Sequence, residues 1–187
     1  MNMENIPVIM LLEDLTKLPN YKLPKGYTIR NFKEGDKKMW AEVETAAGEF
    51  TDPQKGVKQF EIEFEKYRDE LKQRLLMLEN EKGKCIGTSM GWFDDNFFRS
   101  GYGRVHWVGI HPDYQGKGLA KPLVSKTMEI IKERHDKCYL TTQTVSFKAI
   151  KIYLDFGFVP YLKDETCPKA WKLMAEYLNH PALEEFR

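Results

Sequence analysis

One segment constrains the fold more than any other, because an apolar stretch, a glycine-rich turn and an amphipathic run follow one another between residues 105 and 135. Residues 105–110 are mostly β-branched, aromatic or apolar, which predicts a buried strand, and Pro112 ends it because proline cannot donate to a β-ladder. After the turn, apolar side chains recur at the spacing of one helical face, at Leu119, Leu123, Val124, Met128 and Ile131. The pattern therefore predicts a strand, a tight turn and a helix.

The turn Gln115-Gly116-Lys117-Gly118 has the composition of an anion site. The first N–H groups of a helix lack intrahelical partners and lie at the positive end of its dipole. Gly116 and Gly118 have no Cβ to obstruct a phosphate, and Lys117 adds positive charge. These features predict a pyrophosphate cradle, and the alternative is a turn that only joins the strand to the helix.

Spacing distinguishes between nucleotide-binding motifs. A P-loop requires Ser or Thr directly after its Gly-Lys pair, but Gly118 occupies that position. A dinucleotide-binding motif requires a small residue three positions after its second glycine, where this chain has Lys121. Neither motif accounts for the turn.

Residues 115–120 do match the acetyl-CoA signature of the GNAT superfamily of N-acetyltransferases, which is Gln or Arg, two residues, Gly, one residue, then Gly or Ala. Residues 149–158 resemble a second family pattern, Ala-x-x-x-Tyr-x-x-x-Gly-Phe, and the resemblance extends over residues 83–160. It implies an α/β (α+β) GNAT fold, with a mixed central β-sheet flanked by helices. In that fold two splayed parallel strands form the acetyl-CoA cleft.

The resemblance also implies the residues that bind the cofactor. The pantetheine arm is expected to pair with the backbone of Val108, Gly109 and Ile110, as a short added strand would. The diphosphate is expected at Gln115, Gly116, Lys117, Gly118, Leu119 and Ala120. Ser146 is a further candidate, although it stands where the family often has asparagine, so a contact through its side chain is left open. Independently of the resemblance, Ser146 is predicted to cap a helix at residues 147–156, which Gly157 ends.

Two residues are candidates for proton transfer. By the resemblance, Tyr153 is the general acid that donates to the CoA sulfur, and the alternative is a core tyrosine with a hydrogen-bonded hydroxyl. His106 is two residues before Val108, so regular alternation would put both side chains on one sheet face. An imidazole titrates near neutrality and suits a general base. A structural His106, with water as the base, is the alternative.

Two helices are predicted at residues 37–47 and 54–68, with Asp36 as the cap of the first. The resemblance implies that the connection between them lies on the acceptor side of the cleft. Glu49 is the candidate carboxylate for an amine, and Phe50 the candidate apolar wall. The alternative is a solvated carboxylate and a contact between helices. On the predicted strand 85–93, small residues at Gly87, Ser89 and Gly91 leave one face bare, so another backbone or a ligand must pack there.

Length and composition bound the remaining possibilities. The 187 residues predict one domain, with an N-terminal extension at 1–25, where residues 8–12 form a strand or a helix, and a C-terminal helical extension at 165–187. A net charge of +1 argues against a nucleic-acid binder. The apolar run 6–12, interrupted by Pro7, suits neither a signal peptide nor a membrane span. Three scattered cysteines without ligand spacing predict free thiols, no metal and a cytoplasmic location.

The expected function is transfer of an acetyl group from acetyl-CoA directly to the primary amine of a small-molecule acceptor. Two alternatives stay open. One is a non-catalytic acyl-CoA-binding regulatory module, and the other is an acyltransferase for a longer acyl-CoA, which the bare face of strand 85–93 would accommodate. The C-terminal helix, which carries Trp171, is a candidate homodimer interface.

Overall fold

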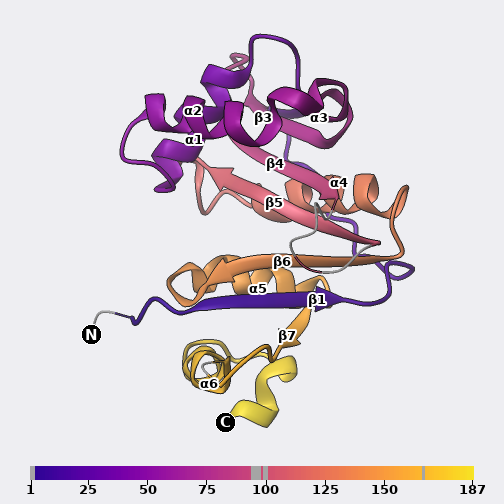
Figure 1. The fold of residues 1–187 in the computed structure, drawn as a ribbon, viewed down its shortest axis with the longest axis vertical. Coiled ribbons are helices and arrows are strands. Elements are labelled where there is room, and N and C mark those ends of the chain that lie inside the picture. Colours follow the sequence, from indigo (N-terminus) through magenta and orange to yellow (C-terminus); the bar gives the residue numbers. More distant parts are fainter. Residues whose placement is uncertain (1–2, 94–97, 99–100, 166) are drawn as a thin grey trace. The chain divides into compact units, whose positions relative to one another are not determined.

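The computed structural model describes residues 3–93, 98, 101–165 and 167–187, and contacts divide the chain into two compact units. The larger unit consists of Asn20–Phe93 and Arg104–Arg134. The smaller unit consists of Met1–Pro19, Asp94–Gly103 and His135–Arg187. Figure 1 shows the elements of both. The division of 1–187 into one domain with two extensions stays a prediction.

The larger unit is built on antiparallel strands. In chain order its elements are β2 (Tyr27–Asn31), α1 (Lys37–Ala47), α2 (Pro53–Phe64), the 3-10 turn η1 (Glu65–Tyr67), α3 (Arg68–Arg74), β3 (Leu75–Asn80), β4 (Cys85–Phe93), β5 (Tyr102–Ile110), the 3-10 turn η2 (Pro112–Tyr114) and α4 (Ala120–Lys132). Strand β3 pairs antiparallel with both β2 and β4, and β5 follows β4 in the sheet.

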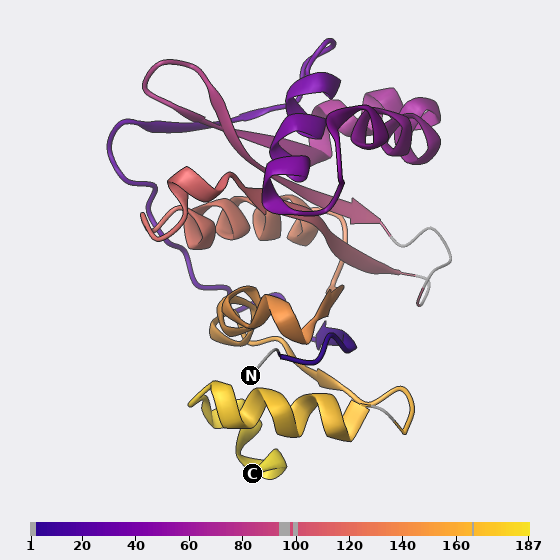
Figure 2. The same cartoon turned by 90° about the vertical axis from the view of Figure 1, so that its left-hand side faces the viewer.

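Successive side chains of strand β3 pack into two separate hydrophobic clusters, one on each face of the larger unit's sheet. Leu75 and Met77 of β3 pack into a cluster with α1 and α2 that contains Trp40 and Phe64. Leu76 and Leu78 face the other way, into a cluster with α4 that includes Leu123. Because successive strand residues point to opposite faces, α1 and α2 cover one side of this sheet and α4 the other (Figure 2).

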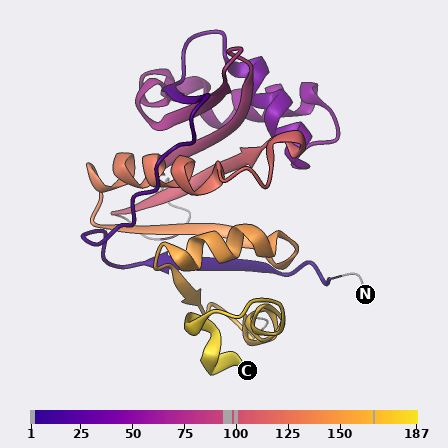
Figure 3. The same ribbon diagram turned by 180° about the vertical axis from the view of Figure 1, so that it is seen from behind.

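The smaller unit is organised around the N-terminal strand. Its elements are β1 (Pro7–Leu12), β6 (Lys137–Gln143), the 3-10 turn η3 (Thr144–Ser146), α5 (Phe147–Asp155), β7 (Val159–Tyr161), α6 (Cys167–Tyr177) and the 3-10 turn η4 (Pro181–Phe186). Strand β1 lies between β6 and β7 and pairs antiparallel with each (Figure 3). Residues 8–12 are therefore a strand, and not the helix that the sequence left open.

The C-terminal helix α6 buries its tryptophan inside the smaller unit. Trp171 is 0% exposed, and its ring lies 6.3 Å from that of Phe186. A side chain without exposed surface cannot contact a second copy of the chain. Trp171 therefore does not support a homodimer interface on this helix, and packing within the unit explains the apolar face.

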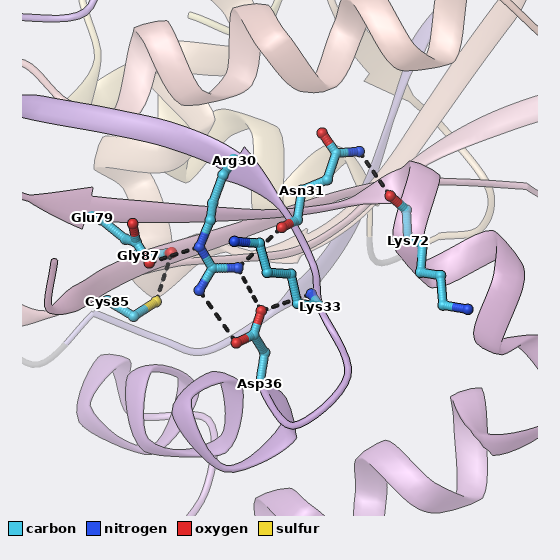
Figure 4. Close-up of polar contacts among 8 residues, drawn as sticks. All are labelled: Arg30, Asn31, Lys33, Asp36, Lys72, Glu79, Cys85 and Gly87. Carbon is cyan, nitrogen blue, oxygen red and sulfur yellow. Dashed lines mark hydrogen bonds and ion pairs between the residues drawn. The ribbon is translucent and has the colours of Figure 1, made fainter.

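Asp36 does not cap α1 with its side chain, contrary to prediction. Its carboxylate instead binds the Arg30 guanidinium, at 2.5 Å between Nη1 and Oδ2, and accepts the backbone N–H of Lys33 at 2.8 Å (Figure 4). Arg30 also donates to Glu79 at 2.7 Å. A charge-assisted pair is stronger than a neutral hydrogen bond, so Arg30 holds the carboxylate away from the helix.

Two helix predictions also need correction. The predicted helix 54–68 is broken at Phe64, where φ is −121°, into α2, η1 and α3. Ser146 precedes α5 as predicted but makes no side-chain capping hydrogen bond, because the 3-10 turn η3 leads directly into the helix.

Among the helices in the described ranges, none has the length and hydropathy needed to span a membrane.

Candidate functional site

Strand β5 is irregular at its centre. Trp107 has φ +47°, and it is the only non-glycine residue with positive φ in the described part of the chain. His106 Nε2 lies 3.0 Å and Trp107 Nε1 3.1 Å from the same atom, Oε2 of Glu63. Neighbouring side chains of a regular strand point to opposite faces, so both reach one atom only because the alternation breaks here. The regular alternation assumed for a shared face of His106 and Val108 is therefore absent at this point of β5, and the shared face stays a prediction.

Glu63, from helix α2, holds the side chains of both residues. Burial by itself would raise the pKa of its carboxyl, but hydrogen bonds from His106, Gln59 and Trp107 outweigh that effect and lower the pKa to about 2. Glu63 is therefore an anion at neutral pH. It orients the His106 ring through a hydrogen bond at Nε2.

A second carboxylate, on α1, lies directly against β5. Glu44 is only 1% exposed, and the Thr88 hydroxyl donates to its Oε1. Both carboxylate oxygens lie 2.9 Å from the position that a Cβ on Gly109 would occupy. Gly109 is therefore required because the Glu44 carboxyl fills the space that any larger residue would need.

Glu44 has unusual electrostatics. Burial raises the pKa of its carboxyl to about 8. The hydrogen bond from Thr88 opposes this rise, whereas the negative charge of Glu49 increases it. Glu49 is more than a third exposed, yet partial desolvation raises its pKa as well. Glu44 therefore changes protonation close to neutral pH, where an ordinary glutamate is fully ionised.

Phe50 connects the end of α1 to β5. It is half-buried, and its ring stacks on Trp107 with 5.4 Å between centroids and lies 5.9 Å from the Trp40 ring. Glu49 precedes it, and its backbone N–H donates to the Glu44 carbonyl at 3.0 Å. The two residues predicted to contact the acceptor thus adjoin Glu44 and the irregular part of β5. Their contact with a substrate stays a prediction.

The turn before α4 is open, and it leads into a helix start without a side-chain cap. Gly116 and Gly118 have φ +74° and +73°, a left-handed conformation that favours glycine, and no atom lies within 4 Å of a Cβ built on either. Both are exposed, and α4 begins after Leu119 without a side-chain cap. Pro122 has no N–H, so the backbone donors at this end are those that precede it.

The polar side chains of the turn have partners within the larger unit. Gln115 Nε2 donates to the Ile110 carbonyl at 3.0 Å, which ties the turn to the end of β5. Lys117 Nζ lies 4.7 Å from the centre of the Tyr114 ring. Contacts of these two residues with a diphosphate stay predictions.

The bare face of β4 is filled by protein. A Cβ on Gly87 would meet the Gly109 carbonyl oxygen at 3.1 Å, and one on Gly91 would meet Ile130 of α4 at 3.0 Å. Ser89 Oγ lies 2.6 Å from Thr127 Oγ1, also on α4. Close packing of α4 and β5, and not a ligand, therefore explains the small residues. The structural basis for a longer acyl chain at this face is lost.

The two remaining candidates belong to the smaller unit. Tyr153 of α5 is 6% exposed, and its ring meets that of Phe158 edge-on at 6.0 Å. Ser146 is half-buried at the start of the same helix. Their roles toward the CoA sulfur and the cofactor stay predictions.

A family model described as "Acetyltransferase (GNAT) family" matches residues 37–158, which contain the irregular strand, the glycine turn and Tyr153. The chain belongs to the GNAT family. The match to this family's fold is independently supported by a GCN5-related N-acetyltransferase from Sphaerobacter thermophilus, with a TM-score of 0.68 at 19% identity over 84% of this chain and 49% of that one. PH1933 from Pyrococcus horikoshii aligns with a TM-score of 0.59 over 74% of this chain and 92% of that one, at 19% identity. The α/β GNAT fold is thus confirmed.

Relatives in sequence are named acetyltransferases. An acetyltransferase from Sodalis glossinidius is 33% identical over 52 residues, which are 28% of this GNAT chain and 33% of the relative. A mycothiol acetyltransferase from Paenarthrobacter aurescens is 27% identical over 163 residues, 82% of this chain and 49% of the relative. The chain therefore spans between a third and a half of the length of these curated relatives.

Sequence reasoning missed two residues that lie against β5 in this GNAT chain, Glu44 and Glu63. Glu44 stands at i+4 from Trp40 and next to Val43, on the apolar stripe of α1. A carboxylate on such a stripe was the signal that could have revealed it. Glu63 lies at the edge of the α2 stripe beside Phe60 and Phe64, and it gave no such signal.

The GNAT chain shows no sign of a metal centre in the ranges that the structure covers. No group of three or more His, Cys, Asp or Glu side chains is arranged there to hold an ion. Cys85, Cys138 and Cys167 are buried free thiols.

Proposed function

We propose that this chain is an acetyl-CoA-dependent N-acetyltransferase that transfers the acetyl group directly to the primary amine of a small molecule. The observation that carries the proposal is the exposed start of α4. Two left-handed glycines and an uncapped helix terminus coincide there with the family's cofactor motif. Backbone N–H groups at a helix N-terminus form a ready anion site.

The residues of the larger unit fit the cofactor. A diphosphate would bind the amides of the turn and of the helix start, which precede Pro122, while the pantetheine arm would pair with β5 at residues 108–110. The open space around Gly116 and Gly118 suits close approach of a phosphate. The bound cofactor supplies an acetyl thioester, and its carbonyl would be polarised by the Val108 N–H.

Transfer to an amine also requires a neutral nucleophile and a proton for the departing thiolate. Tyr153 is the proposed donor to the sulfur. For removal of the proton from the ammonium, sequence reasoning offers His106 or water, and the structure adds that Glu63 holds His106 Nε2. Glu49 and Phe50 are the proposed contacts for the acceptor.

The first experiment mixes purified protein with acetyl-CoA and a panel of primary amines, and it measures free thiol against time. Acceptor-dependent release of thiol supports the proposal. Cofactor binding by calorimetry without release for any amine would favour the non-catalytic module. Absence of any heat of binding would overturn the proposal altogether.

A pair of glycine variants tests the cradle. Gly118→Glu should abolish binding of acetyl-CoA, because it places bulk and negative charge where the diphosphate is proposed. Gly83→Glu is the matched control, since Gly83 has φ +72° in the β3–β4 turn and equally open surroundings. The backbone strain is therefore similar in both variants. Equal cofactor affinity of the two would remove the turn from the site.

A further inference from the structure

Helix α1 carries a row of polar atoms without partners. In the described residues, Trp40 Nε1, Glu44 Oε2 and Thr45 Oγ1 are buried and make no hydrogen bond. Trp40 and Glu44 lie one helical turn apart, on the face that packs against the sheet. Buried polar groups in folded proteins are nearly always satisfied, and an unsatisfied carboxylate oxygen is costly. Such an atom therefore calls for a ligand or a chemical role.

The position of Glu44 suggests which role. Its carboxyl occupies the Cβ space of Gly109, at the stretch of β5 that is proposed to pair with the pantetheine arm. The Thr88 hydroxyl that donates to Oε1 also lies 3.5 Å from the Trp107 carbonyl oxygen. One oxygen of the carboxyl is thus held in place, and the other is unengaged beside the cofactor strand.

We infer that Glu44 is the proton acceptor that converts the ammonium form of the acceptor into the nucleophilic amine, an assignment that rests on the proposed function. The Glu44 carboxylate takes one proton from the ammonium, directly or across one water. The amine nitrogen then bonds to the thioester carbonyl carbon, and the C–S bond breaks. The thiolate takes up one proton, and the nitrogen gives up its second proton to become the amide, so this exchange needs no net proton. Glu44 finally releases its own proton to solvent.

The surroundings favour Glu44 over His106 for this step. His106 Nε2 is hydrogen-bonded to the anionic Glu63, so that ring nitrogen is already engaged. The groups that act on Glu44 are few: β4 presents the hydroxyl of Thr88, β5 presents the backbone at Gly109, and the loop after α1 presents Glu49. Only Glu49 among these titrates, and its charge discourages ionisation of Glu44.

The charge state suits the role as well. A general base works best when its pKa lies near the working pH, because both protonation states are then accessible. Burial brings the pKa of Glu44 to about 8, whereas an exposed glutamate would be too weak a base. The position of the Glu44 carboxyl beside β5 and its raised pKa thus both favour Glu44 as the base.

The test compares Glu44→Gln with the matched control Glu42→Gln, an exposed glutamate on the same helix. The assay uses several amines of different basicity, so that titration of the amine is separable from that of the enzyme. In the wild-type protein, kcat/KM should rise with pH to a plateau, with one midpoint near 8 common to all amines. Glu44→Gln should lower kcat/KM at neutral pH by about 100-fold or more and remove this common midpoint. Affinity for acetyl-CoA should be unchanged, and Glu42→Gln should behave as wild type.

A second variant keeps the inference testable if Glu44→Gln does not fold. Thr88→Val removes the hydrogen bond that favours the ionised form of Glu44, so the common midpoint should move to higher pH. A purely structural role of Glu44 would leave the midpoint in place.

The outcomes separate this inference from the proposed function. If wild-type protein releases no thiol with any amine, the proposed function fails. If the wild type is active but Glu44→Gln keeps its rate and pH profile, only the role of Glu44 is wrong. Parallel loss of acetyl-CoA affinity and of rate in Glu44→Gln would also overturn that role, because Glu44 would then only support β5.

Discussion

The carboxyl of Glu44 occupies the space of a missing side chain on Gly109, since both of its oxygens lie 2.9 Å from the Cβ position of that glycine. Helix α1 and strand β5 therefore pack against each other through the buried carboxyl group of Glu44. This contact explains a glycine one residue before the end of β5, since glycine is otherwise unfavourable within a strand.

The contact predicts the effect of Gly109→Ala. The added methyl would force Glu44 aside, and overpacking of this kind costs about 1–3 kcal/mol of unfolding free energy. Thermal or denaturant unfolding measures the loss. Combining Gly109→Ala with Glu44→Ala should cost less than the sum of the two single changes, because the space is then free. Strict additivity in this double-mutant cycle would show that the two residues do not compete for space.

A second prediction concerns stability against pH. The pKa of Glu44 rises from 4.5 to about 8 on folding, so between these values the folded state binds more protons than the unfolded state. Its contribution is therefore largest below pH 4.5 and falls as the pH rises toward 8, by up to about 1.4 kcal/mol per pH unit. Glu44→Gln should gain stability relative to wild type across this window. A difference that is constant with pH would mean that Glu44 ionises as an ordinary glutamate does.

Glu63 should show the opposite dependence. Its pKa falls from 4.5 to about 2 on folding, so its contribution to stability is complete above pH 4.5 and disappears as the pH falls toward 2. Glu63→Gln should therefore be less stable than wild type at neutral pH and approach it in acid. Urea unfolding at a series of pH values measures the difference. Glu81→Gln, on the exposed β3–β4 turn, serves as the control.

Replacement of Tyr153 by Phe tests the proposed acid. The change removes one hydroxyl from a buried ring and keeps the contact with Phe158. If Tyr153 protonates the thiolate, turnover should fall by about 100-fold or more while the affinity for acetyl-CoA changes little. Calorimetry and thiol release together separate the two effects. Unchanged kinetics would assign Tyr153 to the core alone.

Because the cysteines are buried, we expect the protein's own thiols to react slowly with the reagent that detects released CoA thiol. Cys85, Cys138 and Cys167 are 6%, 0% and 4% exposed, and burial raises the pKa of Cys85 to about 11. Since the thiolate is the reactive form, an aromatic disulfide reagent should label none of them rapidly in the native protein at neutral pH. All three should react once the protein is unfolded in guanidinium chloride. Fast labelling of the native chain would contradict the burial of these residues.

Predictions from short stretches of sequence survived in the structure. The strand that ends at Ile110, the turn at residues 115–118 and the helix from Ala120 depend on neighbours within a few residues. The same is true of α1, α6 and Gly157 at the end of α5. Local propensities and periodic patterns are sufficient for such elements.

Some predictions assumed a regular strand, or side chains without competing partners, and these did not hold in the structure. The predicted alternation of side chains around His106 is absent because Trp107 adopts a positive φ. Nothing about a tryptophan in the sequence indicates this conformation. The cap at Asp36 failed because Arg30 competes for its carboxylate. The face around Gly87 held packed protein where a ligand had been considered, since a missing side chain does not reveal what fills its place.

The sequence by itself determined the family, the strand, turn and helix of the proposed cofactor site and the identity of Tyr153 as a candidate, because these lie in contiguous motifs. Only the tertiary structure decided that Glu44 lies against Gly109 and that Glu63 holds His106. In both pairs a helix residue meets a strand residue from a distant part of the chain. The protonation of a buried carboxyl depends on what surrounds it in space, and its neighbours in the sequence do not specify those surroundings.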